Sequence, residues 1–149
     1  MANPLFDALF APHIGSAAPF LFLPSGKRIS DGEFLTQAAQ FANVIRDAGL
    51  EPGDRMAVQI EKSPEALAVY AACVITGVVF LPLNTAYAPA EVSYFLSDSS
   101  ARLFVCDPSN HDALTSTAEA AEASVMTLGS VGDGSFADAA KTKPAQFKV

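Results

Sequence analysis

An apolar run over residues 66–83 restricts the possible folds of this chain more than any other feature. Every residue in the run is uncharged and nonpolar except Thr76, and the run contains Gly77 and Pro82. Its length reaches the lower limit for a helix that crosses a bilayer. Gly77, however, favours the end of a helix, and residues 78–81 (VVFL) have side chains typical of a strand. We therefore interpret the run as a buried helix followed by a buried strand, and not as a membrane span.

Strands and helices alternate along most of the chain. Apolar runs predict strands at residues 56–60, 78–81, 103–106 and 125–128. Helices are predicted to begin at Ser30, Ser63, Pro89 and Asp112, because each position carries a capping residue or an early proline ahead of an apolar or alanine-rich stretch. Short apolar strands joined by helices predict an α/β fold, with a mainly parallel sheet and flanking helices.

Two further features complete the expected architecture. Residues 20–23 and 27–29 flank Pro24-Ser25-Gly26, which predicts a short β-hairpin ahead of the first long helix. The length of 149 residues suits one compact unit over residues 1–149. After residue 128 the pattern weakens, and we expect 129–149 to be a loop and a loose tail, with at most one helical turn at 136–140.

Charge and cysteine content exclude several classes of function. The formal net charge is −7 and the basic residues are scattered, so general binding to nucleic acid is not expected. The two cysteines, Cys73 and Cys106, fit no metal-ligand spacing and are interpreted as buried free thiols in a reducing compartment. The first residues, MANP, lack the pattern of a secretory signal, so a cytoplasmic protein is expected.

The residues alone indicate no reactive site. The sequence contains neither G-x-G-x-x-G nor G-x-x-x-x-G-K-[ST], and Gly132–Ser135 is interpreted as a surface turn. Glu61 and Asp107, which follow two predicted strands, are the nearest approach to an acidic phosphoacceptor pair. His13 and His111 stand apart from any partner for a triad or a metal. We therefore predict no catalytic, cofactor-binding or metal-binding residue in this chain.

Three segments, in order, resemble the adenylate-forming acyl-CoA synthetases, the AMP-binding family. They are GKRISDGEFLTQAAQFAN from residue 26, GLEPGDRMAVQIEKSPE from residue 49, and CVITGVVFLPLNTAYAPAEVSYFLSDSSARLFVCD from residue 73. The last resembles the family pattern A-G-x-x-x-x-P-L-N-P-x-Y, with Thr76-Gly77 in place of Ala-Gly. Within the family, PLNTAY and VCDPS are similar to the malonyl-CoA synthetases.

The resemblance implies an enzyme that forms an acyl-adenylate from a short carboxylate, malonate or a related acid, and Mg-ATP, then transfers the acyl group to CoA. The family's phosphate loop, acyl pocket, ribose-binding Asp and catalytic Lys come after the resembling region, so no catalytic residue is carried over to this chain. The positions that match the family motifs are interpreted as scaffold: Gly77, Pro82, Asn84, Tyr87 and Tyr94.

This resemblance predicts that the chain is the amino-terminal fragment of such an enzyme's large domain. The fragment alone is then expected to be inactive, with ATP, Mg and CoA used by the full-length enzyme. We also expect the fragment to self-associate through surface that the full enzyme covers, with paired sheet edges as one route. The alternatives are a free-standing α/β binding module and a small flavodoxin-like enzyme, which would bind its cofactor at the carboxyl ends of the strands.

Overall fold

The computed structural model describes residues 2–148. The elements, in chain order, are α1 (Pro4–Leu9), the 3-10 helix η1 (Ala11–His13), β1 (Pro19–Phe22), β2 (Arg28–Ser30), α2 (Asp31–Asp47), β3 (Arg55–Gln59), α3 (Pro64–Thr76), β4 (Val79–Pro82), α4 (Pro89–Ser99), β5 (Leu103–Cys106), the 3-10 helix η2 (Pro108–Asn110), α5 (His111–Ala120), β6 (Ser124–Thr127) and α6 (Ser135–Ala140). The predicted fold class is confirmed, and the strand bounds differ from the predicted ones by no more than one residue.

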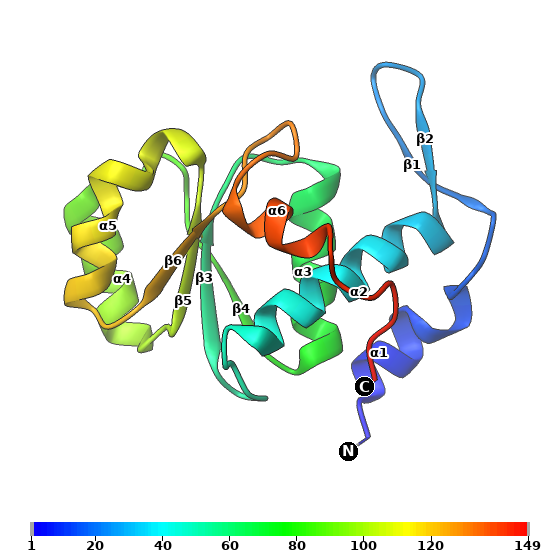
Figure 1. Ribbon diagram of the computed structural model, residues 1–149, viewed down its shortest axis with the longest axis horizontal. Helices are drawn as coiled ribbons and strands as arrows, with labels where there is room; N and C mark the ends of the chain where they lie inside the picture. The colour runs from blue at the N-terminus through cyan, green and yellow to red at the C-terminus, as the bar shows by residue number, and fades with distance from the viewer. Residues whose placement is uncertain (1, 149) are drawn as a thin grey trace.

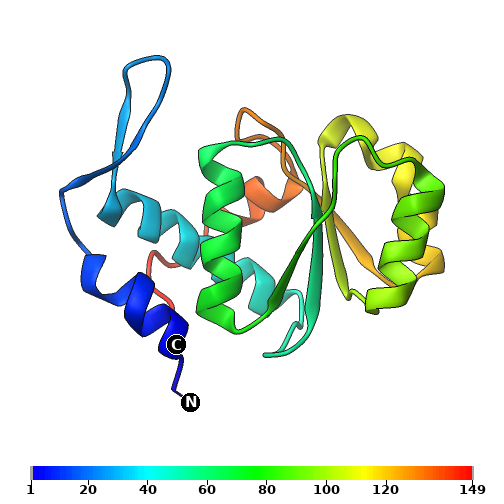
Figure 2. The same cartoon turned by 180° about the vertical axis from the view of Figure 1, so that it is seen from behind.

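A parallel sheet of four strands, in the order β4-β3-β5-β6, lies at the centre of the molecule. Helices α2, α3 and α6 cover one face of this sheet, and α4 and α5 cover the other (Figure 1). The chain leaves β3 toward one face and β5 toward the opposite face. Strands β1 and β2 form a separate antiparallel hairpin that projects from the body beside α2, as both views show (Figure 2).

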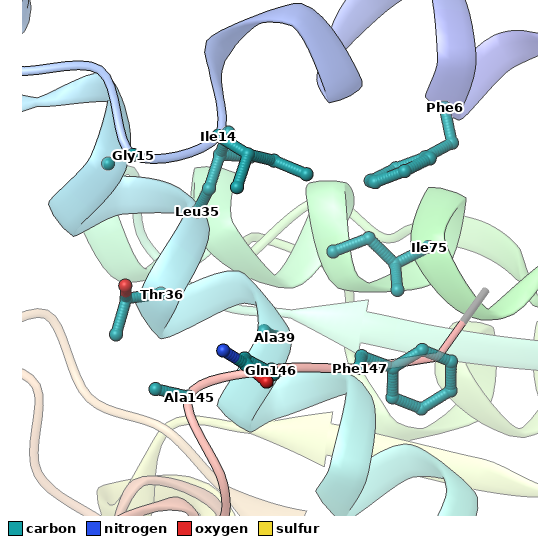
Figure 3. A pocket seen from close by; sticks show the side chains of 11 residues that line it. Phe6, Ile14, Gly15, Leu35, Thr36, Ala39, Ile75, Ala145, Gln146 and Phe147 are labelled. Atoms are coloured by element: carbon teal, nitrogen blue, oxygen red, sulfur yellow. The ribbon is translucent and has the colours of Figure 1, made fainter.

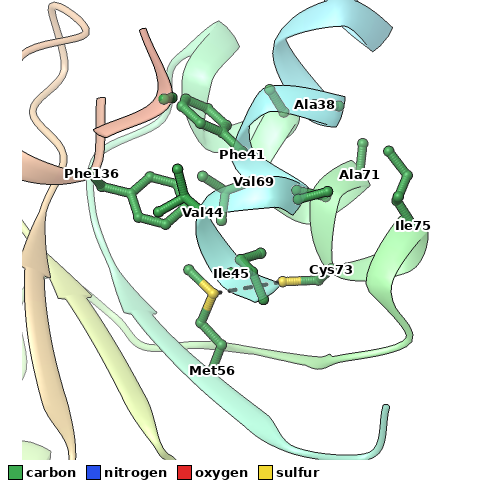
Figure 4. Packing of buried hydrophobic residues seen from close by; sticks show 14 of the residues in the cluster. Ala38, Phe41, Val44, Ile45, Met56, Val69, Ala71, Cys73, Ile75 and Phe136 are labelled. Carbon is green, nitrogen blue, oxygen red and sulfur yellow. Dashed lines mark hydrogen bonds between the residues drawn. The ribbon is translucent and has the colours of Figure 1, made fainter. Parts of the chain in front are cut away.

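The sheet separates two apolar clusters. The larger one lies under α2, α3 and α6, where Phe41 packs against Phe136 with ring centroids 5.0 Å apart and Met56 contacts Cys73 (Figure 4). The smaller one lies under α4 and α5 and contains Leu96 and Phe104. Because both faces of β5 are covered, all four of its side chains are buried, which explains its continuous apolar sequence.

The predicted helix starts follow from local capping. The Ser30 hydroxyl accepts a hydrogen bond from the Glu33 amide, and the Glu33 carboxylate accepts one from the Ser30 amide and has a lowered pKa as a result. Ser63 caps α3 in the same way through Ala66, with Pro64 in the first helical position. Both caps were predicted from the sequence and are confirmed.

The structure divides the apolar run where the sequence predicted. Helix α3 ends at Thr76, Gly77 adopts a left-handed conformation with φ +74°, and β4 begins at Val79. Among residues 2–148, no helix is long and apolar enough to cross a membrane.

The two ends of the chain differ from expectation. Helix α1 was not predicted, and neither was the 3-10 helix η1, which contains His13. The segment after α6 is not loose, because the Asn43 side chain on α2 donates hydrogen bonds to the carbonyls of Pro144 and Gln146. Helix α1 has a local start signal that the sequence analysis missed, because the Asn3 side chain accepts from the Phe6 amide and Pro4 is its first residue. The segment after α6 has no such signal, since it is held by a residue about 100 positions away.

The turn at Gly77 generates a stability prediction. Valine at this position would hold a β-branched residue at φ +74°, and its Cβ would lie 3.1 Å from the Cβ of Pro52. We expect Gly77→Val to lower the free energy of unfolding by roughly 1–3 kcal/mol from backbone strain alone. Gly53→Val is the matched control, because Gly53 has φ +91° but nothing within 4 Å of the added Cβ. Urea denaturation should rank Gly77→Val below the control, and an unchanged midpoint for Gly77→Val would contradict the prediction.

Candidate functional site

The carboxyl ends of β3 and β5 form the most favourable position for a ligand in this fold. These two strands are neighbours in the sheet, but the helices that follow them cover opposite faces. In open α/β sheets, ligands bind in the crevice where the connections diverge in this way. The segments at this edge are those that follow β3, β4, β5 and β6.

The two acidic residues predicted as a possible pair do not act together. Asp107, after β5, accepts hydrogen bonds from the Ser109 amide at 2.9 Å and from the Ser109 hydroxyl at 2.6 Å. Its carboxylate therefore caps η2. Glu61, after β3, is exposed to solvent. Each carboxylate thus has the role of a strand-end charge rather than of a phosphoacceptor site.

Gln59 holds the turn between β4 and α4, although no sequence motif singled it out. Its side chain is buried, and Nε2 donates to the carbonyls of Asn84 at 2.9 Å and Tyr87 at 3.3 Å. The Asn84 side chain in turn accepts from the Ala86 amide at 2.9 Å. A glutamine among the apolar residues of β3 was the available signal, because a buried amide needs partners. The PLNTAY segment is therefore fixed to the end of β3.

The tyrosines in the family-like segment pack at the rim of the smaller cluster. The Tyr87 ring stacks on Phe95 with centroids 5.1 Å apart, and Tyr94 meets the same ring edge-on at 5.4 Å. Tyr94 remains 63% exposed. Both arrangements agree with a packing role for these residues.

The glycine-rich segment after β6 is closed on itself. The Ser135 hydroxyl accepts from the Thr127 amide, and the Thr127 hydroxyl accepts from the Ser135 amide, both at 2.9 Å. Gly134 has φ +114°, and a Cβ there would lie 2.4 Å from the Thr127 carbonyl oxygen. The Gly129 and Gly132 amides donate within the same loop. The amides of Gly129, Gly132 and Ser135 are thus paired within the loop, and the segment is a turn, as predicted.

The thiols are not reactive groups. Both cysteines are free and buried. Burial raises the pKa of Cys73 to about 12, and burial together with the nearby Asp107 carboxylate raises that of Cys106 to about 11. Both thiols are therefore protonated at neutral pH, and the thiolate is the nucleophilic form.

The histidines also lack the geometry of a catalytic or metal site. The Asp31 carboxylate lies between the Ser16 hydroxyl at 3.0 Å and His13 Nδ1 at 3.8 Å, whereas a nucleophilic triad places histidine between serine and the acid. His111 contacts Asp112 at the exposed start of α5. Within residues 2–148 no three side chains of His, Cys, Asp or Glu are grouped to hold a metal ion.

Comparison with known proteins decides the family. The sequence profile described as "AMP-binding enzyme" matches residues 14–148. The chain belongs to the AMP-binding enzyme family. Among curated members of this family, feruloyl-CoA synthase of Amycolatopsis is 32% identical over 93 residues, which are 62% of this chain and 19% of that protein. Acetyl-coenzyme A synthetase of Chlorobaculum tepidum is 32% identical over 75 residues, or 50% of this chain and 11% of that protein.

A solved member of the AMP-binding family shares nearly the whole of this structure. Apo MatB from Rhodopseudomonas palustris superposes with a TM-score of 0.87 and 43% sequence identity, over 97% of this chain and 28% of MatB. The resemblance to the AMP-binding acyl-CoA synthetases is thereby confirmed. The region that this chain matches is 11% to 28% of the length of these relatives.

Proposed function

We propose that this chain is the amino-terminal part of the large domain of a longer acyl-CoA synthetase. That enzyme would form an acyl-adenylate from a carboxylate and Mg-ATP and transfer the acyl group to CoA. The observation that supports this most strongly is the 43% identity to MatB over 97% of the chain, together with the 28% of MatB that it covers. MatB has also been solved with ATP bound.

Within that enzyme, residues 1–149 would serve as scaffold. Residues in the family-like segments have structural roles: Gly77 permits the turn out of α3, and the Gln59 side chain donates hydrogen bonds to the carbonyls of Asn84 and Tyr87. We propose that the catalytic, cofactor-binding and metal-binding residues all belong to the rest of the enzyme. ATP, Mg and CoA would then bind to the longer protein.

Malonate is the carboxylate that we propose for the longer enzyme. MatB is a malonyl-CoA synthetase, and its similarity to this chain, at 43% identity, covers 97% of it. The two curated relatives described above are named for feruloyl and acetyl groups, at lower identity and over less of the chain. Other short or dicarboxylic acids are the competing substrates.

The scaffold role predicts that the 149-residue chain alone makes no acyl-CoA. Mixed with malonate, ATP, Mg and CoA, it should release AMP no faster than a protein-free blank, because the proposal places the residues that act on the carboxylate and the triphosphate in the rest of the enzyme. Calorimetric titration with Mg-ATP should give no saturable heat. AMP release above the blank, or a micromolar dissociation constant for ATP, would contradict the scaffold role.

Self-association of the isolated chain is a second proposal, and the backbone pairing restricts its route. Along β4, the Val79 and Leu83 amides donate to the carbonyls of Asp54 and Val58. The backbone of Phe80 and Pro82 therefore faces the open edge, where Pro82 has no N–H to offer. In β6, Thr127 faces outward, but its amide is bonded to Ser135. Each edge therefore offers few free donors, and we propose contact through side chains rather than paired strands.

The surface beside the β4 edge is suited to such a contact. Leu67 and Tyr70 lie one turn apart on α3 and are 39% and 36% exposed, and the Tyr70 ring meets Phe80 edge-on at 5.6 Å. Adjoining apolar side chains that are partly exposed can be covered by a second copy of the chain. A second copy, with the same surface, is the proposed partner.

We expect sedimentation at micromolar concentration to give a species heavier than the 15.5 kDa monomer. Tyr70→Lys should shift the population to monomer, because it places a charge in the apolar contact. The matched control is Val131→Lys, at a loop residue that is 85% exposed, and it should leave the mass unchanged. A monomeric wild-type chain would refute the proposed contact.

A further inference from the structure

A pocket of about 320 Å³ lies away from the segments at the carboxyl edge of the sheet. Residues of α1, α2 and α3 surround it, together with the loop after η1 and residues 143–147, which we call the strap (Figure 3). Phe6, Ile14, Leu35, Ala39, Ile75 and Phe147 supply most of its wall. The pocket thus lies between segments from both ends of the chain.

Polar side chains of α2 hold the strap in place. These side chains, on Asn43, Arg46 and Asp47, do not line the pocket. Asn43, which is only 2% exposed, donates to the carbonyls of Pro144 at 3.2 Å and Gln146 at 3.0 Å. Its own oxygen accepts from Arg46 Nη2 at 2.6 Å. The Lys143 ammonium hydrogen-bonds the Asp47 carboxylate and lowers its pKa.

The aromatic ring of the strap, Phe147, is also held by a residue that does not line the pocket. The Arg46 guanidinium lies 5.0 Å from the centroid of the Phe147 ring. Buried polar groups with this many partners give a single arrangement of the chain. The strap therefore keeps one wall of the pocket in place while the space beside it stays open.

The lining determines what the pocket can accept. None of its residues carries an ionisable side chain, and Thr36 and Gln146 supply its polar side chains. A charged ligand would lose hydration there without gaining a partner. Ile14 points into the pocket yet is 64% exposed, so an apolar ligand would cover surface that water now contacts.

We propose that this pocket binds a small, uncharged, apolar molecule of one or two rings, at a site separate from the carboxyl edge of the sheet. Apolar cavities of about 150 Å³ accept benzene, so a volume of about 320 Å³ accommodates a two-ring molecule. The size of the space, its lack of charge and its fixed wall all match this class of ligand.

Indole, which is neutral, and indole-3-acetate, which is an anion of similar shape, provide the test. Titration of the isotope-labelled chain should give saturable NMR shifts with indole at Leu35, Ala39 and Ile75. Indole-3-acetate should bind with an affinity at least tenfold lower than that of indole, because the pocket offers its charge no partner. Absence of saturable shifts with indole, or equal binding of the anion, would overturn the proposal.

Two variants separate ligand binding from folding. Ile14→Ala removes an exposed side chain at the mouth of the pocket and should weaken indole binding roughly three- to tenfold, since it removes apolar contact. Val131→Ala truncates an exposed side chain elsewhere and should not change the affinity. Equal effects of the two variants would overturn the site. Displacement of indole when the chain dimerises would show that a second copy, and not a small molecule, occupies the pocket.

Discussion

The close packing of α2 against α3 on one face of the sheet is the contact on which the other features of this structure depend. Ala68, Ala71 and Ala72 on α3 are completely buried, as are Ala38 and Ala42 on α2. Small side chains on both helices let their backbones approach, and larger residues of α3 such as Val69 then fill the space above β3. A larger side chain at any of these positions would separate the helices.

This packing supports the proposed structural role of the family-like motifs. A buried helix that must return at once into a buried strand needs a left-handed residue at its end, and Gly77 supplies it, with its carbonyl accepting from the Gly53 amide at 2.9 Å. The chain then leaves β4 through Pro82 into a turn whose carbonyls are bonded to Gln59. The same residues that identify the AMP-binding family therefore hold the sheet and its connections together.

The sequence predicted those parts of the fold that have a local physical signal. The caps at Ser30 and Ser63 and the stop at Gly77 each depend on a few neighbouring residues, so their patterns could be interpreted directly. The fixed strap could not be predicted, because Asn43 meets Pro144 from 101 residues away. Gln59 was missed for a similar reason: its partners lie on another turn, and nothing in the strand pattern indicates which carbonyls it would reach.

A segment exchange tests the scaffold role most directly. This chain would replace the matching 28% of MatB, and malonate-dependent AMP release by the chimera would be measured. If the segment supplies fold and no reacting group, the chimera should keep a kcat within about tenfold of that of MatB, a barrier change below about 1.4 kcal/mol. A chimera that folds and binds ATP but releases no AMP would contradict the scaffold role.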